Sequence, residues 1–235
     1  MNSSIETPRL DCYSKAALAD MVKAAREALN CQRVLHKAGL NLVGEILKGQ
    51  GDFVELDHYP RDDVYDADSG SQYYYHAHRE GEHGHFHLFG RPAEANRPGQ
   101  VKAATHLVAV SMDAWGKPIA LFTTNRWVTA EHWRPAPETL ALAERFEIDH
   151  AWPSWPVNRW LGAMLRCYRP YLEVLLAHRD QEIQRLKRED SNIFEDRRIE
   201  VIGQLPVALP AWARSLEQAL SRMDRAKQQS VIDGS

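Results

Sequence analysis

Apolar side chains near the start of the chain recur every three or four residues, the spacing of an amphipathic helix. This pattern runs from residue 14 to residue 38, with Ser14 at the position of a helix N-cap and Gly39 just beyond its end. A shorter apolar stretch follows over residues 40–48. The pattern predicts a helical region over residues 14–48.

The helical period is lost in the next part of the chain. Residues 53–70 gather acidic side chains around Pro60, which indicates one short strand and a loop. From Ser71 to Thr129, residues that favour strands form four blocks separated by Gly- or Pro-bearing turns. The blocks are SQYYYHAHR, HFHLFG, THLVAVSMD and PIALFTTNRWVT, with a loop over 91–100 and a hairpin turn over 113–118. We expect a small antiparallel sheet of about five strands.

The helical period returns in the last part, over residues 137–146, about 157–189, and 211–227, with a charged break over 190–198. Pro170 should interrupt the middle helix. Leu172, Leu175, Leu186 and Leu216 lie on apolar stripes that could pack internally or form a homodimer seam. The sequence predicts an α+β fold in one domain over residues 1–235, its sheet (53–129) flanked by N-terminal (14–48) and C-terminal (137–228) helices.

Composition narrows the functional class. The 235 residues are 44% hydrophobic and 26% charged, as in ordinary globular proteins. A net charge of −3, from 29 basic and 32 acidic residues, argues against nucleic acid as a partner. No apolar run approaches the roughly 18 residues of a membrane span, so we expect no membrane association. Three widely spaced cysteines favour a reduced, cytoplasmic location.

Histidines provide the strongest chemical signal. Five of the 11 fall within the twelve residues from His76 to His87. Because strand side chains alternate between faces, a core face formed by Tyr73, Tyr75, Ala77, Phe86 and Leu88 would place the histidines of both strands on the other face. These strand histidines are His76, His78, His85 and His87.

Two hairpin registers keep these imidazoles together. A turn at Gly81–Glu82 would place His85 opposite His78. A turn at Glu80–Gly81 would place His85 opposite His76. Opposed side chains are about 4.5–5.5 Å apart at Cβ, close enough to converge on one metal ion, whereas a three-residue loop would separate them. The alternative to a metal site is a polar sheet face on which the histidines are hydrogen-bonded or solvated.

Further polar residues extend the candidate site. Glu82 could ligate the metal, accept a hydrogen bond from a ligand histidine or serve as the catalytic group that handles a proton. Tyr74 should share the histidine face and could handle a proton. Asn125 and Arg126 could hold a substrate carboxylate, although a surface salt bridge is equally consistent. The histidines that could replace one of the ligands are His58, His83 and His106.

Gly70, His76, His78 and Glu82 have the spacing of the first motif of the cupins, and this stretch resembles that family. The resemblance implies a double-sheet barrel with a mononuclear iron, manganese, copper or zinc ion. Its ligands would be His76, His78, Glu82 and one further histidine, frequently in an oxygen-dependent enzyme. The second cupin motif is missing, and five expected strands fall short of a jelly roll.

The blocks SQYYYHAHR, GEHGHFHLF and LFTTNRWVT, with helices on both sides, also resemble an uncharacterised bacterial domain family. That resemblance extends over nearly the whole chain. It implies a shared α+β domain and carries no known activity.

The predicted function is a metal-dependent enzyme, specifically a non-haem oxidoreductase acting on a small molecule. Its cofactor would be one transition metal ion, iron, copper or zinc, because imidazole ligands suit these ions. The alternatives are a metal-binding protein for storage, delivery or sensing, a zinc hydrolase, and a helical interaction module in which the histidines are structural. No common nucleotide-binding or serine-hydrolase motif is present.

Overall fold

The computed structural model describes residues 5–92 and 104–233. The expected loop over 91–100 therefore lies almost wholly outside the described residues. The helices and strands follow one another in this order: α1 Lys15–Lys37, α2 Leu42–Leu47, β1 Tyr59–Tyr65, β2 Gln72–His76, β3 Gly84–Gly90, β4 Thr105–Met112, β5 Pro118–Thr124, α3 Arg126–Thr129, α4 Ala136–Glu144, α5 Trp155–Cys167, α6 Arg169–Lys187, the 3-10 turn η2 Ile193–Glu195, β6 Val201–Pro206 and α7 Leu209–Asp233.

The sheet is antiparallel throughout. Its six strands lie in the order β1-β2-β3-β4-β5-β6, so each strand pairs with the next one along the chain. The helices α3 to α6 fall between β5 and β6, whereas β2 to β5 follow one another directly. The α+β class is confirmed, with one strand more than expected and with one open sheet in place of a double-sheet barrel.

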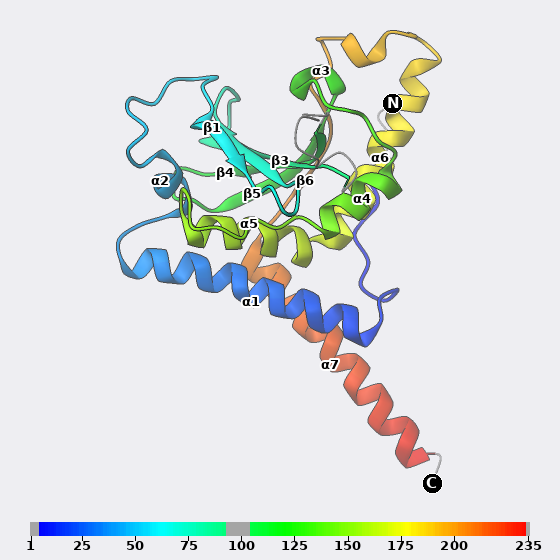
Figure 1. Cartoon of the computed structure of the whole chain (residues 1–235). Coiled ribbons are helices and arrows are strands. Elements are labelled where there is room, and N and C mark those ends of the chain that lie inside the picture. Colours follow the sequence, from blue (N-terminus) through cyan, green and yellow to red (C-terminus); the bar gives the residue numbers. More distant parts are fainter. Residues whose placement is uncertain (1–4, 93–103, 234–235) are drawn as a thin grey trace.

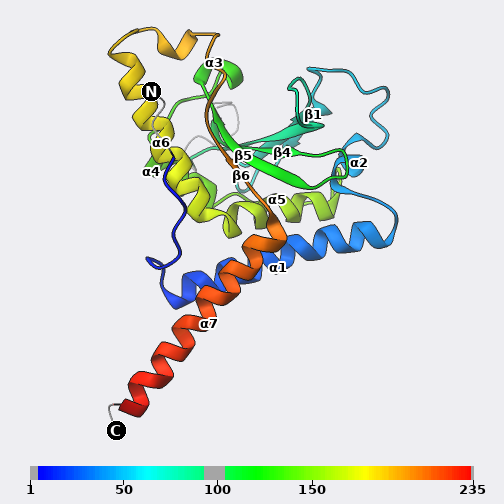
Figure 2. The same ribbon diagram turned by 180° about the vertical axis from the view of Figure 1, so that it is seen from behind.

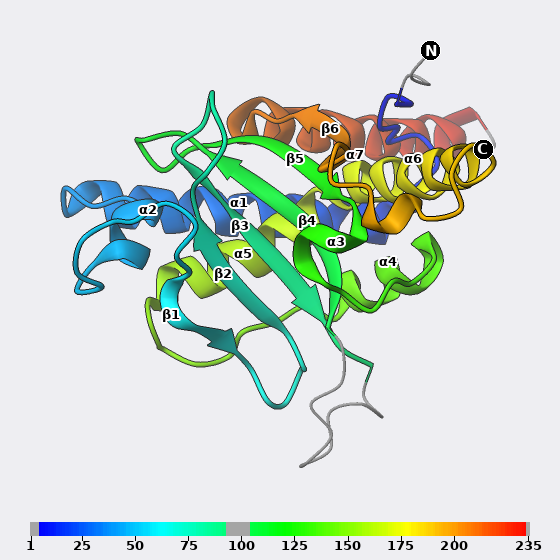
Figure 3. The ribbon, with the colours of Figure 1, turned by 90° about the horizontal axis from the view of Figure 1, so that it is seen from above.

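The main helices lie on one side of the sheet. In Figure 1, α5 runs beneath the strands and α1 runs beneath α5, while Figure 2 shows α6 beside β6. Seen from above, the strands β2 to β5 lie in front, and none of the helices that are drawn crosses them (Figure 3). One face of the sheet therefore packs on helices, and the other is left for the site.

Burial explains the packed face. Tyr73, Phe86 and Leu88 are completely buried in the core, and the ring of Phe86 lies 6.1 Å from that of Trp160 on α5. The hydroxyl of Tyr73 donates a 2.5 Å hydrogen bond to Oδ1 of Asn158. The sheet face that the two-residue alternation predicts to be buried is thus the face that packs on α5.

Helix boundaries follow local chemistry. Ser14 caps α1, its hydroxyl accepting a hydrogen bond from the backbone N–H of Ala17. The expected long helix is divided at Tyr168, and Pro170 lies in the first turn of the second part, α6. Because proline has no N–H to donate, it is tolerated in a first turn and not in the middle of a helix.

Two segments differ from the sequence-based prediction. The strand expected to run to Thr129 ends at Thr124, because Asn125 caps the short helix α3. The strand β6 was not predicted. Its sequence, VIGQLP, contains Gly203, and a Cβ atom there would come within 2.7 Å of the His178 ring on α6. Glycine and proline weaken the strand signal, although the close approach of α6 requires the glycine.

The C-terminal helix α7 packs along α1 and then extends away from the body (Figures 1 and 2). Leu172, Leu175 and Leu216 are buried in the core and pack internally, whereas Leu186 is only half-buried. Homodimer formation stays a prediction. None of the helices in the described part of the chain combines the length and hydrophobicity needed to cross a membrane.

Candidate metal centre

The strands β2 and β3 bring histidines together on the face away from α5. His76 lies directly opposite His85, and Tyr74 lies opposite His87. This is the second of the two predicted registers. The connecting segment is longer than a two-residue turn, because β2 ends at His76 and β3 begins at Gly84.

Three imidazole nitrogens converge at this point. Nε2 of His85 lies 2.8 Å from Nε2 of His76 and 3.1 Å from Nε2 of His87. The ligand atoms of all three residues lie within 4.8 Å of one another. Two nitrogens bound to one zinc ion at its usual bond length would be about 2.9 Å apart at a right angle and about 3.3 Å apart in a tetrahedron. The spacing therefore suits a single metal ion.

Hydrogen bonds orient two of the three rings. Nδ1 of His85 lies 2.5 Å from Oε1 of Glu82, and Nδ1 of His87 lies 2.9 Å from Nε2 of His106. Nδ1 of His106 in turn lies 3.3 Å from the hydroxyl oxygen of Thr124. Each of these three contacts is a hydrogen bond when Nδ1 of His85, His87 or His106 carries the proton and donates it away from the cluster. His85 and His87 then direct Nε2 lone pairs towards the cluster, as metal ligands do.

The rings are held in the uncharged form that a metal requires. Burial, followed by the nearby His85 and other imidazoles, lowers the pKa of His76 to about 2. Burial also lowers the pKa of His85 and takes that of His87 well below its usual range. With Nδ1 protonated in both rings, the Nε2 lone pairs of His85 and His87 face one another at 3.1 Å and repel, and a cation between them removes that repulsion. We regard this as the strongest physical indication of a metal site.

Glu82 has a different charge state. Burial raises the pKa of its carboxyl, but the hydrogen bond from His85 and the positive charge of Arg79 outweigh this, so the pKa lies below its usual range. Glu82 is therefore an anion behind His85. Its carboxylate orients a ring, whereas in the cupin pattern it would be a ligand itself.

Aromatic rings enclose the cluster. The ring of Tyr74 lies 5.3 Å from that of His76 and 5.2 Å from that of His87, and it stacks on His58 at 3.6 Å. Phe122 lies 5.1 Å from His85. Tyr74 shares the histidine face as expected, and burial raises the pKa of its phenol, so the hydroxyl keeps its proton at neutral pH. The cluster thus lies in a largely apolar setting.

The other histidines near the sheet take different positions. The ring of His78 lies 4.8 Å from His76 and 5.1 Å from His85, and its Nε2 lies 3.8 Å from a carboxylate oxygen of Glu200. His83 instead contacts the hydroxyl of Tyr75 at 2.7 Å. Within the described residues, the converging group comprises His76, His85 and His87, and His78 stands beside it. A ligand role for His78 stays a prediction.

Asn125 and Arg126 lie away from the cluster and are engaged with the segment that precedes β6. The amide of Asn125 donates to the carbonyl of Ile193, and Arg126 forms an ion pair with Glu195. These contacts fasten α3 to the η2 turn. The substrate-binding role expected for the two residues gains no support from this arrangement and stays untested.

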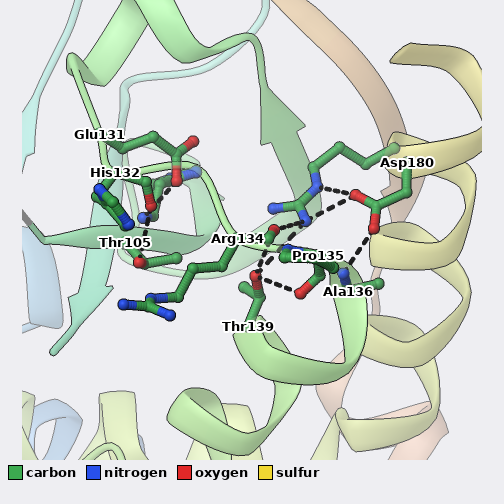
Figure 4. A network of polar contacts seen from close by, with 10 residues as sticks. Thr105, Glu131, His132, Arg134, Pro135, Ala136, Thr139 and Asp180 are labelled. Carbon is green, nitrogen blue, oxygen red and sulfur yellow. Dashed lines mark hydrogen bonds and ion pairs between the residues drawn. The ribbon is translucent and has the colours of Figure 1, made fainter. Parts of the chain in front are cut away.

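Hydrogen bonds surround residues 131–139, beside the strand that carries His106 (Figure 4). One carboxylate oxygen of Glu131 accepts the backbone N–H of His106 at 2.8 Å, and the hydroxyl of Thr105 donates to the carbonyl of His132. Nearby, buried Arg179 on α6 donates to the carbonyl of Arg134. The start of β4, which carries His106, is therefore tied to Glu131 and His132 in the segment after α3.

Sequence reasoning considered His106 only as a substitute ligand and passed over Thr124, Glu131 and Arg79. Strict alternation along THLVAVS would place His106 on the packed face with Val108 and Val110. The register shift between Leu88 and Phe89 reverses this and pairs His106 with Phe89 on the histidine face. Glu131 and Arg79 lie outside the strands, where no periodicity indicates their direction. The positions of these two side chains are set by the loops that carry them.

Fold and site together define an α+β protein whose sheet carries a buried three-histidine group able to hold a metal ion. The model of the family called Domain of unknown function (DUF6969) matches residues 22–207, so the chain belongs to that family. This confirms the resemblance to an uncharacterised domain family. No match to the chain was found among the curated proteins or among the solved structures.

Proposed function

We propose that the protein is a metal-dependent enzyme with one transition metal ion held by His76, His85 and His87. The observation that carries this proposal is the convergence of three buried Nε2 atoms, with separations of 2.8 and 3.1 Å along the group. The outward hydrogen bonds of His85 and His87 supply the tautomers that the ion requires. Iron, copper and zinc are the ions that prefer such ligands.

The specific activity that we infer is that of a non-haem oxidoreductase acting on a small molecule. Three protein ligands leave open positions, which catalytic metal sites use and closed structural sites lack. Within the described residues, the converging group consists of imidazoles and includes no carboxylate oxygen. The metal would supply the redox chemistry when bound.

The neighbouring residues would do the remaining work. Tyr74, protonated at neutral pH and packed against two of the rings, is the group that could donate a proton to a bound substrate. Glu82, an anion behind His85, would raise the basicity of that ring and keep its orientation. Tyr74 is therefore our candidate catalytic residue, and Glu82 is a positioning residue.

A second candidate function rests on His78. Its ring lies close enough to His76 and His85 for a modest side-chain movement to bring in a fourth imidazole. Four imidazoles would close a tetrahedral ion, which suits storage, delivery or sensing and not catalysis. The contribution of His78 to binding separates the two functions.

The test begins with the metal content of protein produced without an affinity tag. We expect near-stoichiometric iron, copper or zinc in the wild type and its loss in His85→Ala and His87→Ala. The variant His36→Ala, altered at an exposed position in the last turn of α1, is the matched control and should retain the metal. Failure of the wild type to bind any of the three ions would refute the metal site.

Two further measurements address catalysis. His78→Ala should retain the metal if the site is open, and a large loss of affinity would favour the closed, non-catalytic alternative. Oxygen consumption with small organic acids and amines should require the metal and fall in Tyr74→Phe by about a hundredfold if the phenol transfers the proton. Equal rates in wild type and Tyr74→Phe would remove Tyr74 from the mechanism.

A further inference from the structure

A groove of about 420 Å³ lies between the last turns of α1, the residues that lead into α2, and the turn that joins β4 to β5. The turn contributes Trp115 and Lys117, and the residues before α2 include Leu40. On α1 the lining residues recur every three or four positions and share one face of the helix: Leu29, Gln32, Arg33 and His36. We call this the Trp115 groove.

The turn that carries Trp115 is held firmly. Oδ1 of Asp113 accepts the backbone N–H of Trp115 at 2.9 Å and that of Lys117 at 2.8 Å. Gly116 lets the turn approach the residues before α2, since a Cβ atom there would lie 2.8 Å from Oδ1 of Asn41. Trp115 is nevertheless 77% exposed, the highest value among the large apolar residues that the structure describes. An exposed tryptophan on a fixed turn suits a binding anchor, because tryptophan dominates many protein interfaces.

The Trp115 groove is basic, and its cations are unpaired. Arg33 bonds to a neutral amide oxygen on its own helix at 2.6 Å, and neither Arg33 nor Lys117 forms an ion pair within the described part of the chain. None of the lining residues is acidic. Glu45 on the adjoining α2 is offset by Lys48, at 3.8 Å. Even with Asp113 counted, one positive charge is left in excess, and both cations can pair with incoming carboxylates.

The residues between α2 and β1 have the complementary character. Positions 52–57 read DFVELD, and every residue from 51 to 58 is exposed. Three large apolar side chains lie here, between 42% and 67% exposed: Phe53, Val54 and Leu56. The three carboxylates form no ion pair with residues that the structure describes: Asp52, Glu55 and Asp57. Exposed apolar side chains gathered in one place mark interaction sites, and this acidic segment (residues 52–57) matches a basic groove.

Hydrogen bonds hold the acidic segment away from the groove of its own chain. The backbone N–H of Leu56 donates to the carbonyl of Ala77, and that of Val54 donates to the hydroxyl of Tyr59. The acidic segment follows α2, whereas the groove lies at the start of α2, a helix of six residues and about 9 Å. Both surfaces are therefore at the same end of the molecule, where Figure 3 shows α2. A twofold axis at this end would let the acidic segment of each copy enter the groove of the other.

We propose that the Trp115 groove binds the acidic segment of a second copy of this chain, and that two such reciprocal contacts form a symmetric homodimer. The carboxylates would pair with Arg33 and Lys117, and the apolar side chains of the segment would cover the indole of Trp115. A membrane or nucleic acid suits the groove less well, because the groove is concave and the chain has a net charge of −3. The proposal does not depend on the metal centre.

The experiment is sedimentation velocity of the full-length protein over a range of concentrations. We expect a reversible dimer that weakens as salt is added, because exposed charges are screened. Trp115→Ala should raise the dissociation constant by about tenfold or more. The control Lys23→Glu/Arg214→Glu reverses two exposed charges elsewhere on α1 and α7 and should dimerise as the wild type does.

Charge reversal identifies the two surfaces. The groove variant Arg33→Glu/Lys117→Glu and the segment variant Glu55→Lys/Asp57→Lys should each be monomeric, because like charges would face one another. An equimolar mixture of the two should form a heterodimer, since opposite charges then meet at both contacts. Circular dichroism checks that each variant is folded, and the single changes Lys117→Glu and Glu55→Lys serve if a double variant is not.

Three results would overturn the proposal: a wild type that is monomeric throughout the concentration range, a dimer that survives charge reversal in folded variants, or a mixture that stays monomeric. A monomeric wild type that binds vesicles of anionic lipid, and loses this binding in Trp115→Ala, would assign the groove to a membrane surface and would also overturn the dimer. Because none of these measurements involves a metal, their failure would leave the proposed enzyme function unaffected.

Discussion

Oε1 of Glu82 lies 2.5 Å from Nδ1 of His85, on the side of the ring opposite to the Nε2 cluster. The two residues are only three positions apart, and the turn before β3 brings the carboxylate behind the ring. A carboxylate in this position fixes both the tautomer and the orientation of a metal-binding imidazole. Glu82 therefore acts on the cluster through His85.

Glu82→Gln should weaken metal binding without abolishing it. The amide can still accept a hydrogen bond from Nδ1, but it lacks the charge that raises ligand basicity, and comparable changes lower metal affinity by about 10- to 100-fold. Competition with a chromogenic chelator would measure the change. Glu80→Gln, at an exposed position of the same connection, is the control. Equal affinity in wild type and Glu82→Gln would show that the carboxylate is not coupled to the metal.

His106→Phe should reduce metal affinity by a similar factor, although His106 is not one of the three converging residues. The phenyl ring fills the buried space but cannot accept the proton of His87 Nδ1, which would lose its partner. Unfolding in urea should show a loss of about 1–3 kcal/mol. His132→Ala, altered at an exposed position near the same network, should change neither quantity. Normal metal affinity in a folded His106→Phe would contradict the orienting role.

Gly84→Ala should disrupt the cluster through the backbone. A Cβ atom at this position would lie 2.5 Å from the Tyr75 hydroxyl and 2.6 Å from the carbonyl oxygen of His76, closer than real Cβ contacts. The strands β2 and β3 would have to separate next to His85. We expect a loss of about 1–3 kcal/mol in urea unfolding, as for other overpacked sites, together with weaker metal binding.

The matched control for that change is Gly81→Ala, at a position in the same connection where no atom lies within 4 Å of the added Cβ. Gly81 has a φ of +83°, so alanine is strained there and a stability loss is expected. Metal affinity should nevertheless stay close to that of the wild type. If both variants bind metal as well as the wild type, the close approach at Gly84 does not position the cluster.

Glu131 should make stability depend on pH. Burial, opposed by Arg179, raises the pKa of this carboxyl to about 7 in the folded protein, whereas an unfolded chain has the ordinary value near 4.5. The folded state therefore holds a proton that the unfolded state releases between these values, and the stability it contributes is present below pH 4.5 and lost as pH rises through 7. The full effect is roughly 3 kcal/mol.

Urea unfolding of wild type and Glu131→Gln at several pH values between 4.5 and 8 would measure this contribution. Because the amide does not titrate, the wild type should lose stability relative to the variant as the pH rises. A constant difference between the two proteins would mean that Glu131 is ionised in the folded protein throughout this range.

Much of the fold was predictable because it follows from local patterns. The two-residue alternation of Tyr73, Phe86 and Leu88 identified the face that packs on α5. Pro170 marked the break between α5 and α6. The strand β6 was missed because its residues are half-exposed and include glycine, and its pairing with β5 depends on contacts between segments far apart in sequence.

The candidate site, too, could be predicted from the sequence only in part. The spacing of the histidines was enough to predict that His76, His85 and His87 share one face. It did not determine the hairpin register, and it left His78 equal to the others as a ligand. The contacts of His106 and Arg79 come from β4, β5 and β6, so no pattern within the hairpin could indicate them.

The sequence by itself determined the α+β class, the packed face of the sheet and the presence of an imidazole-rich surface opposite to it, because the alternation of strand side chains is a local property of the backbone. Only the tertiary structure decided which nitrogens converge and which donors lack acceptors. Those relationships depend on how closely segments such as the β2–β3 connection and β6 approach one another, and this approach is set only when the sheet is assembled.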